Sequence, residues 1–288
     1  MHRMSTDWQI GPALLAEGKM LFAVGDIHGF FDLLSELRRF IQDEIDNRPD
    51  LRCKIVYLGD YIDRGPQSLE VLEFVTKEWE FGVIETVFLC GNHEQFLKSL
   101  LDMDADDEPA DMAESTAMWL FNGGDSAIRS FRLGLSQTDM ENLPVLRDRI
   151  VEVLGPEVVD FLKQLRLWHR EDDYLFVHAG IDPVTPFPES NLEDLLWIRN
   201  PFLDALPRWI NPFAVVHGHT PSCQEVLPHR IGVDTGVYMC EALTAVQIYG
   251  HQVRFLTVAR DVPELWQQDL RRGQPLQYRL MSADAPKS

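Results

Sequence analysis

Hydrophobic and polar positions in the first hundred residues follow two alternating kinds of spacing. Short apolar runs at Met20–Val24, Lys54–Leu58 and Val83–Cys90 predict buried strands, each followed by a glycine. Between them, Phe31–Ile45 carries apolar residues close to helical period, and Leu69–Phe74 lies in a second helical pattern. Strands separated by helical segments are typical of βαβ units, so we expect an α/β fold.

The middle of the chain has a different pattern. Asp102–Glu114 is acidic and interrupted by proline, whereas Ser115–Leu133 and Pro156–Leu167 look helical. We interpret about residues 98–170 as a helical cap, with a flexible acidic loop, inserted into one domain that takes in the whole chain (1–288).

The last third of the chain returns to apolar runs of strand length. Tyr174–His178 and Ala214–His217 predict strands, and Leu243–Tyr249 with Val253–Ala259 resembles a hairpin. The sequence after Leu280 is polar and predicts a frayed tail.

Polar residues cluster directly after five of the predicted strands. Ligands of open α/β sheets gather at the carboxyl ends of the strands, and the glycines in each cluster permit tight turns. The clusters are therefore expected to meet at one site. In chain order they are Gly25-Asp26-Ile27-His28-Gly29, Gly59-Asp60-Tyr61-Ile62-Asp63-Arg64-Gly65, Gly91-Asn92-His93-Glu94, Phe176-Val177-His178-Ala179-Gly180 and Val216-His217-Gly218-His219-Thr220.

The side chains in these clusters are typical of a metal site. Histidine mixed with Asp and Asn suits a borderline metal such as Mn, Fe or Zn. Cysteine is absent from the clusters, which argues against a structural zinc site.

Composition narrows the expected partners. With 26 basic and 46 acidic residues the net charge is −20, which argues against a nucleic-acid polymer or an anionic membrane as the main partner. Bound metal ions can still attract a phosphorylated substrate. The chain has four cysteines but no CxxC pair, and it shows neither a secretory signal nor an apolar run long enough to span a membrane. These features favour a cytoplasmic protein. The oligomeric state stays open.

The five motifs GDIHG, GDYIDRG, GNHE, VHAG and GHT, in this order, resemble the phosphoprotein phosphatase branch of the calcineurin-like metallophosphoesterases. The chain is most similar to the bacterial and lambda-phage serine/threonine phosphatases of that branch. The resemblance implies a sandwich of two central β-sheets flanked by helices, and a helical cap inserted between Asn92 and His178.

The resemblance also implies a pair of divalent ions, Mn in the first place, with Fe, Zn, Ni and Co as alternatives. A hydroxide held between them would attack phosphorus in line, without a covalent enzyme intermediate. The implied ligands are Asp26 and His28 for the first metal, Asp60 for both, and Asn92, His178 and His219 for the second.

Further roles are implied for residues beside the ligands. His93 resembles the family's general acid, and Asp63 resembles the carboxylate that orients it. Arg64, Arg199 and Asn92 are expected to bind the phosphate, Arg199 because it lies in a W-x-R-x-x-F segment similar to that of bacterial members.

We expect a serine/threonine protein phosphatase acting on a phosphorylated protein or a small phosphoester. A hydrolase of symmetrical dinucleoside polyphosphates, such as diadenosine tetraphosphate, or of other nucleotides shares the metal motifs and is the alternative. GNHE in place of GNHD, and the intact DRG, favour the first. A binding protein with a degenerate centre is a third reading, which the complete ligand set disfavours.

Three features stay open at this stage. His217 is a possible further ligand. The C-terminal tyrosine motif of many eukaryotic relatives is not evident, and Asp234-Thr235-Gly236 stands near its place. Trp119 and Asn122-Gly123-Gly124 lie in the predicted cap, where they could line the substrate entrance, although we expect a helix-ending turn.

Overall fold

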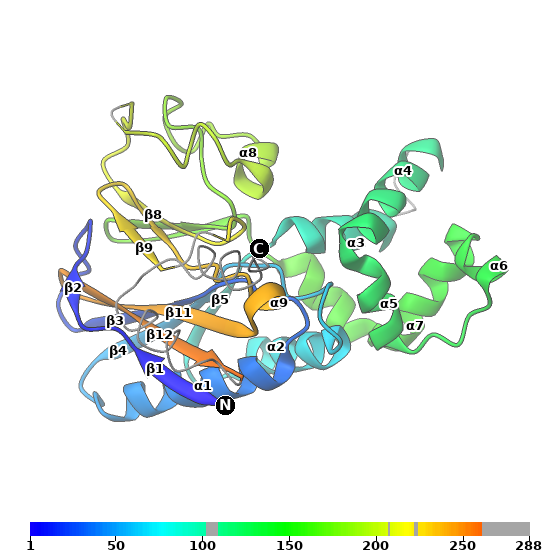
Figure 1. Cartoon of the computed structure of the whole chain (residues 1–288), viewed down its shortest axis with the longest axis horizontal. Coiled ribbons are helices and arrows are strands. Elements are labelled where there is room, and N and C mark those ends of the chain that lie inside the picture. The colour runs from blue at the N-terminus through cyan, green and yellow to red at the C-terminus, as the bar shows by residue number, and fades with distance from the viewer. Residues whose placement is uncertain (102–108, 207, 222–223, 261–288) are drawn as a thin grey trace, which may run out of the picture.

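The computed structural model describes residues 1–101, 109–206, 208–221 and 224–260. Two mixed sheets lie one above the other, with helices on their outer sides (Figure 1). The predicted α/β sandwich is therefore confirmed. Cys223, most of the predicted acidic loop and the predicted C-terminal tail lie outside the described residues.

The larger sheet has seven strands in the order β1-β12-β11-β3-β4-β5, with β2 paired to β12. Strands β3, β4 and β5 are parallel, as the predicted βαβ units require, and β11 with β12 forms the predicted antiparallel hairpin. The strands are β1 His2–Ser5, β2 Gln9–Ile10, β3 Lys19–Val24, β4 Arg52–Tyr57, β5 Glu85–Phe88, β11 Ala242–Tyr249 and β12 Gln252–Ala259.

The smaller sheet has five strands in the order β6-β7-β8-β10-β9, with β7, β8 and β10 parallel. The predicted strands β7 and β8 form its centre, and the remaining strands were not predicted. The strands are β6 Trp168–Glu171, β7 Tyr174–Val177, β8 Ala214–His217, β9 Glu225–Leu227 and β10 Arg230–Gly232.

The apolar run of β3 is continuous because both of its faces are buried. Leu21 and Ala23 pack in the core between the sheets, whereas Phe22 and Val24 pack on the opposite side, against helices. Burying one such large apolar side chain contributes roughly 1.5–3 kcal/mol. The same core between the sheets takes in residues from β7 and β8, so it fixes the strand ends of both sheets relative to each other.

Helices α1 Phe31–Asp46 and α2 Ser68–Phe81 cover the larger sheet, as the helical spacing predicts. Helix α8 Leu192–Trp197 packs on the smaller sheet, and the one-turn helix α9 Val237–Cys240 precedes β11. Within the described ranges, every helix is too short or too polar to cross a lipid bilayer.

The middle of the chain forms helices that extend to one side of the sandwich (Figure 1). Buried side chains of this region, such as Trp119 and Phe161, join the core beneath α1 and α2. The assignment of about residues 98–170 as a cap stays a prediction. The helices are α3 Asn92–Leu101, α4 Pro109–Trp119, the π-helical η1 Leu120–Gly124, α5 Asp125–Phe131, α6 Gln137–Met140 and α7 Leu143–Gln164.

Two predictions for this region need correction. The acidic loop was expected to extend as far as Glu114, and this is wrong because α4 begins at Pro109. A proline does not prevent this, since it is tolerated in the first turn of a helix. The predicted helix over Ser115–Leu133 is interrupted by the π-helical turn, in which Gly123 has a φ of 105°.

Candidate active site

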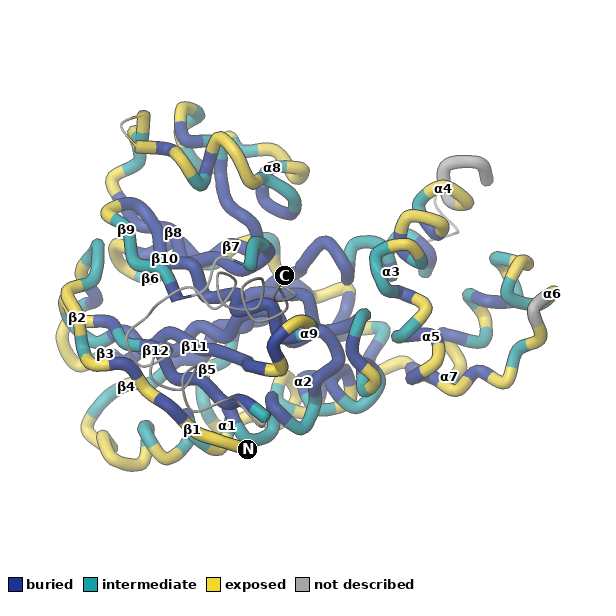
Figure 2. The backbone as a smooth tube through the Cα atoms, in the orientation of Figure 1, coloured by how far each residue is buried: buried dark blue, intermediate teal, exposed yellow. Residues whose placement is uncertain are grey.

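The carboxyl ends of parallel strands from both sheets meet at one place. This is the edge at which α/β sheets bind ligands. Figure 2 shows the strands leading to it as mostly buried, whereas the described residues of α4 and α6 are largely exposed or intermediate. Seven polar side chains with at most 6% exposure follow these strands: Asp26, His28, Asp60, Asn92, His93, His178 and His219.

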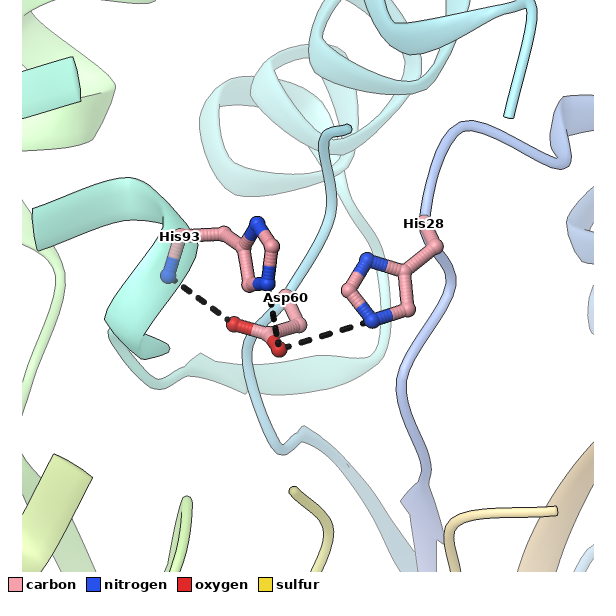
Figure 3. Close-up of side chains that lie close together, drawn as sticks. All are labelled: His28, Asp60 and His93. Carbon is pink, nitrogen blue, oxygen red and sulfur yellow. Dashed lines mark hydrogen bonds and ion pairs between the residues drawn. The ribbon is translucent and has the colours of Figure 1, made fainter. Parts of the chain in front are cut away.

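Asp60, after β4, lies at the centre of a first group of possible metal ligands (Figure 3). Its Oδ2 atom lies 3.6 Å from Nε2 of His28 and 3.9 Å from Nε2 of His93. The backbone N–H of His93 donates to Oδ1 of the same carboxylate at 3.2 Å. One carboxylate therefore faces side chains from two other strand ends.

A second group of possible ligands lies on the other side of the same carboxylate. It consists of Asp60, His178 and His219. His178 Nε2 lies 3.4 Å from Asp60 Oδ1, and Asn92 Oδ1 lies 3.0 Å from both His178 Nε2 and His219 Nδ1. Asp60 belongs to both groups, which is the arrangement expected of a residue that bridges two cations.

The histidine tautomers indicate that these groups suit cations. His28 Nδ1 donates to the carbonyl of Ile62, and His178 Nδ1 donates to that of Leu58, each at 2.9 Å. Each ring therefore presents the lone pair of Nε2 to the oxygens of Asp60. Acceptors that face one another are stabilised when a cation lies between them, so the residues present fit two metal ions.

The charge state of the site agrees with this. Burial lowers the pKa of His28 well below its usual value, and burial followed by the nearby His178 lowers that of His219 to about 2. Both rings are thus neutral, which is the form that binds metals. Burial, followed by the nearby carboxylates of Asp234 and Asp60, raises the pKa of Asp26 well above its usual value. The buried carboxylates of the site therefore repel one another, and a bound cation would offset this repulsion.

Asp26 is held apart from the first group. Both of its carboxylate oxygens accept the backbone N–H of His219 at 3.1 Å. His93, rather than Asp26, completes the group of His28 and Asp60. The ligand role of Asp26 therefore stays a prediction, as do the roles of the other site residues.

The backbone at the site is shaped for close approach. A Cβ atom on Gly91 would lie 2.1 Å from Asp60 Oδ1, and one on Gly218 would lie 2.1 Å from Asp26 Oδ1. His28 and Asp60 themselves have φ angles of 45° and 53°, in the left-handed region. Such residues cost about 1–3 kcal/mol each and cluster at functional sites.

A profile of the calcineurin-like phosphoesterases matches residues 20–255, which take in all five motifs, the whole smaller sheet and most of the larger one. The chain belongs to this family. Its metallophosphoesterase centre accordingly has two groups of His and Asp side chains around Asp60, each of which could hold a metal ion.

Individual relatives of this phosphoesterase include enzymes named for different substrates. Serine/threonine-protein phosphatase 1 of Salmonella typhimurium is 37% identical over 232 residues, 79% of this chain and 91% of the relative. The asymmetrical bis(5'-nucleosyl)-tetraphosphatase PrpE of Bacillus velezensis is 34% identical over 245 residues, 80% and 89% of the two chains. A serine/threonine phosphatase structure from Saccharomyces cerevisiae, 16% identical, covers 86% of this chain and 82% of its own, and its TM-score of 0.51 shows a shared fold.

His93 of the phosphoesterase is paired with Asp63. Nδ1 of His93 and Oδ2 of Asp63 lie 2.6 Å apart, and both residues are at most 1% exposed. Burial lowers the pKa of His93 to about 4, whereas the Asp60 carboxylate acts in the opposite direction. The structure therefore brings together the histidine and carboxylate that the sequence places in the GNHE and GDYIDRG motifs.

Arg64 lies across the same centre. Its two terminal nitrogens are 3.3 Å from Nε2 of His28 and of His93, and its guanidinium lies 4.0 Å from the ring centre of Tyr238. Sequence analysis missed Tyr238, although it follows the Asp234-Thr235-Gly236 segment that was noted. Arg199 is exposed just beyond α8, and its charge acts on His219 and Tyr238.

Glu94 is a second residue whose structural role sequence analysis missed, although it is the last residue of the GNHE motif. It is completely buried and accepts backbone N–H groups of Asp60, Tyr61 and Gly91 at 2.8–3.0 Å. Glu94 thus fixes the loop of Asp60 against the start of α3. The position of a glutamate two residues after Asn92 was the available signal.

His217 lies outside both ligand groups. Its Nδ1 lies 3.0 Å from the carbonyl of Gly218, and its Nε2 lies 3.2 Å from Arg230. Both ring nitrogens thus have protein partners, and Phe202 packs against the ring. The geometry favours His219 over His217 as the ligand from this motif.

Proposed function

We propose that this phosphoesterase hydrolyses phosphate monoesters of alcohols, with phosphoserine and phosphothreonine in proteins as its substrates. The observation that carries the proposal is the buried contact of His93 with Asp63 beside the shared carboxylate of Asp60. An alkoxide is a poor leaving group and needs a proton as it departs. A histidine fixed by a carboxylate is suited to supply that proton.

The metal sites of the proposal follow the two ligand groups. Asp26, His28 and Asp60 would hold one ion, and Asp60 would share the second with Asn92, His178 and His219. We propose manganese, because nitrogen and oxygen ligands without thiolate suit it, with Fe, Zn, Ni and Co as alternatives. When bound, two divalent ions activate water as the nucleophile and stabilise charge on the phosphoryl oxygens.

The remaining side chains would bind and orient the substrate. Arg64 and Arg199 would bind phosphoryl oxygens through their guanidinium groups, and Asn92 would assist them. As the P–O bond breaks, the ester oxygen would keep the bonding electron pair and take the proton from Nε2 of His93. Asp63 would hold the proton on Nδ1 throughout.

Dinucleoside tetraphosphate hydrolysis is the second candidate, supported by the similarity to the tetraphosphatase of Bacillus velezensis. Its leaving group is a nucleotide phosphate, which departs far more readily than an alkoxide. The His93–Asp63 pair is needed less for that reaction, which is why we place dinucleoside tetraphosphate hydrolysis second.

A cytoplasmic location and one domain with a cap at about residues 98–170 complete the proposal.

A competition assay tests the substrate class. A phosphoserine peptide, diadenosine tetraphosphate and p-nitrophenyl phosphate are supplied together to the Mn-loaded protein, and kcat/KM is measured for each. We expect the phosphopeptide to exceed the dinucleotide by at least about tenfold. A dinucleotide preference would replace the first candidate by the second, and the products would distinguish symmetrical from asymmetrical cleavage.

A further inference from the structure

Trp119, at the end of α4, contacts the proposed catalytic pair although it lies 56 residues from Asp63 in the chain. The indole is completely buried, and its Nε1–H donates to Oδ2 of Asp63 at 2.8 Å. The same oxygen lies 2.6 Å from Nδ1 of His93. One carboxylate oxygen therefore receives two donors, one from His93 and one from the helical region.

The π-helical turn after Trp119 fits the indole closely. A Cβ atom on Gly124 would lie 2.6 Å from the indole Nε1, so a side chain there would displace the ring. This explains the second glycine of the Asn122-Gly123-Gly124 sequence. π-helical turns of this kind are frequent at functional sites.

The first glycine of the turn fits the loop of Asp63. The carbonyl of Gly123 accepts the backbone N–H of Arg64 at 3.1 Å, and a Cβ on Gly123 would lie 2.8 Å from Cγ of Arg64. Asp63 and Arg64 have φ angles of 72° and 65°, which surrounding contacts must maintain. The turn supplies contacts to both residues, through Trp119 and through Gly123.

We propose that Trp119 is a positioning residue for proton transfer, which holds the Asp63 carboxylate in the orientation that directs His93 toward the leaving oxygen. This inference rests on the proposed function. An indole N–H is a donor that does not titrate, so it fixes the carboxylate without taking part in the proton transfer. Two donors on Oδ2, together with Ser68 Oγ accepting the Asp63 backbone N–H at 3.0 Å, leave this side chain little freedom to rotate.

The variant Trp119→Phe removes the N–H and keeps an aromatic ring. We expect kcat for a phosphoserine peptide to fall about 10- to 100-fold, the range typical for loss of a supporting hydrogen bond. KM should change less than about twofold, because substrate contacts remain. With 2,4-dinitrophenyl phosphate, whose leaving group needs no proton, the loss should stay below about threefold.

Trp209→Phe is the matched control. Trp209 donates its indole N–H to the carbonyl of Phe213 at 3.3 Å, away from the site, so its loss should alter neither substrate's kcat. Bound metal in Trp119→Phe, measured by elemental analysis, should equal that of the wild type. Equal losses on both esters, loss of metal, or unchanged kcat would each overturn the inference.

A double variant and a spectrum test the route through Asp63. Adding Trp119→Phe to Asp63→Asn should lower kcat no further, because the carboxylate it orients is gone. In ¹H–¹⁵N spectra, the indole resonance that disappears in Trp119→Phe should move upfield in Asp63→Asn, since the charged acceptor is lost. A Trp119 resonance indifferent to Asp63→Asn would refute the contact.

The two proposals fail in different ways. If wild-type protein hydrolyses neither ester, the proposed function is wrong. The Trp119–Asp63 contact is then tested only by whether the Trp119 indole resonance shifts in Asp63→Asn. If the wild type hydrolyses both esters and Trp119→Phe shows no leaving-group dependence, the positioning role is wrong while the function stands. Gly124→Ala, which should displace the indole, is expected to reproduce the pattern of Trp119→Phe.

Discussion

The ring of His93 has a partner at each nitrogen, and this arrangement defines what the residue can do. Nδ1 contacts Asp63, while Nε2 lies 3.9 Å from Asp60 and 3.3 Å from Arg64. Nε2 therefore faces Asp60, the residue that belongs to both ligand groups. In the proposed reaction, a proton delivered from this atom would arrive where Arg64 would hold the phosphoryl group.

The variant His93→Asn tests this residue directly. We expect turnover of a phosphoserine peptide to fall about 10²–10⁴-fold, the usual contribution of a general acid, while most bound metal is kept. Turnover is measured by phosphate release and metal by elemental analysis. His251→Asn, at the exposed turn between β11 and β12, serves as control; near-normal turnover of His93→Asn would contradict the role.

For single residues, the sequence predicted the site residues that directly follow strands. It missed the contacts made by residues that reach the site from helices distant in the chain. Asp60 and His178 follow apolar runs directly, so the strand pattern alone brings them together. Tyr238 meets Arg64, and Trp119 meets Asp63, across long stretches of chain. No local spacing predicts such contacts, because they depend on how the helices pack.

At the scale of elements, Glu171 on β6 connects the smaller sheet to the larger one. It forms ion pairs with Lys19 of β3 and Lys54 of β4, and its side chain is 15% exposed. Burial opposes ionisation, but hydrogen bonds from Lys19 and Lys54 outweigh it and lower the pKa of Glu171 from 4.5 to about 2. The carboxylate is thus stabilised by cations on the opposite sheet.

The two ion pairs of Glu171 make a pH-dependent contribution to stability. The pKa is lower in the folded chain, so the contribution is complete above about pH 4.5 and is lost as the pH falls toward 2. Glu171→Gln should lower the free energy of unfolding by about 1–3 kcal/mol at pH 7, with the difference shrinking below pH 4.5. Urea unfolding at several pH values measures it.

The control for this prediction is an exposed ion pair. Glu152, 65% exposed, pairs with Arg149 on α7, so Glu152→Gln should change stability by less than about 0.5 kcal/mol. A Glu171→Gln effect that stays constant from pH 7 to pH 3 would contradict the assignment.

The buried strands β3 and β7 were predictable, whereas the exposed edge strand β6 was not. β3 and β7 are buried on both faces, which leaves continuous apolar runs in the sequence. β6, with the sequence WHRE, alternates between exposed and half-buried positions at the edge of its sheet. Its pairing with β7 depends on a neighbour rather than on its own composition.

At the scale of the whole molecule, the proposed ligands are divided between the two sheets. Asp60 and Asn92 follow strands of the larger sheet, whereas His178 and His219 follow strands of the smaller one. A cation held by both sets would be lost on unfolding. Binding should therefore stabilise the native sandwich as one unit.

Thermal unfolding with and without metal tests this. After removal of metal by chelator, addition of Mn at about 100 times its Kd should stabilise the protein by about 2.7 kcal/mol per site and raise Tm. Asp60→Asn, which removes the shared carboxylate, should show little rise. An equal rise in both proteins would indicate that the ion binds elsewhere.

The helical region in the middle of the chain contacts the loop of Asp63 and Arg64 at Trp119 and Gly123. Figure 1 shows α6 at the outer end of this helical region, far from both sheets. Insertions and deletions around α6 can therefore accumulate during evolution without displacing Asp63. In the proposed phosphatase, a lineage can in this way acquire new target proteins while inheriting the same His93–Asp63 geometry.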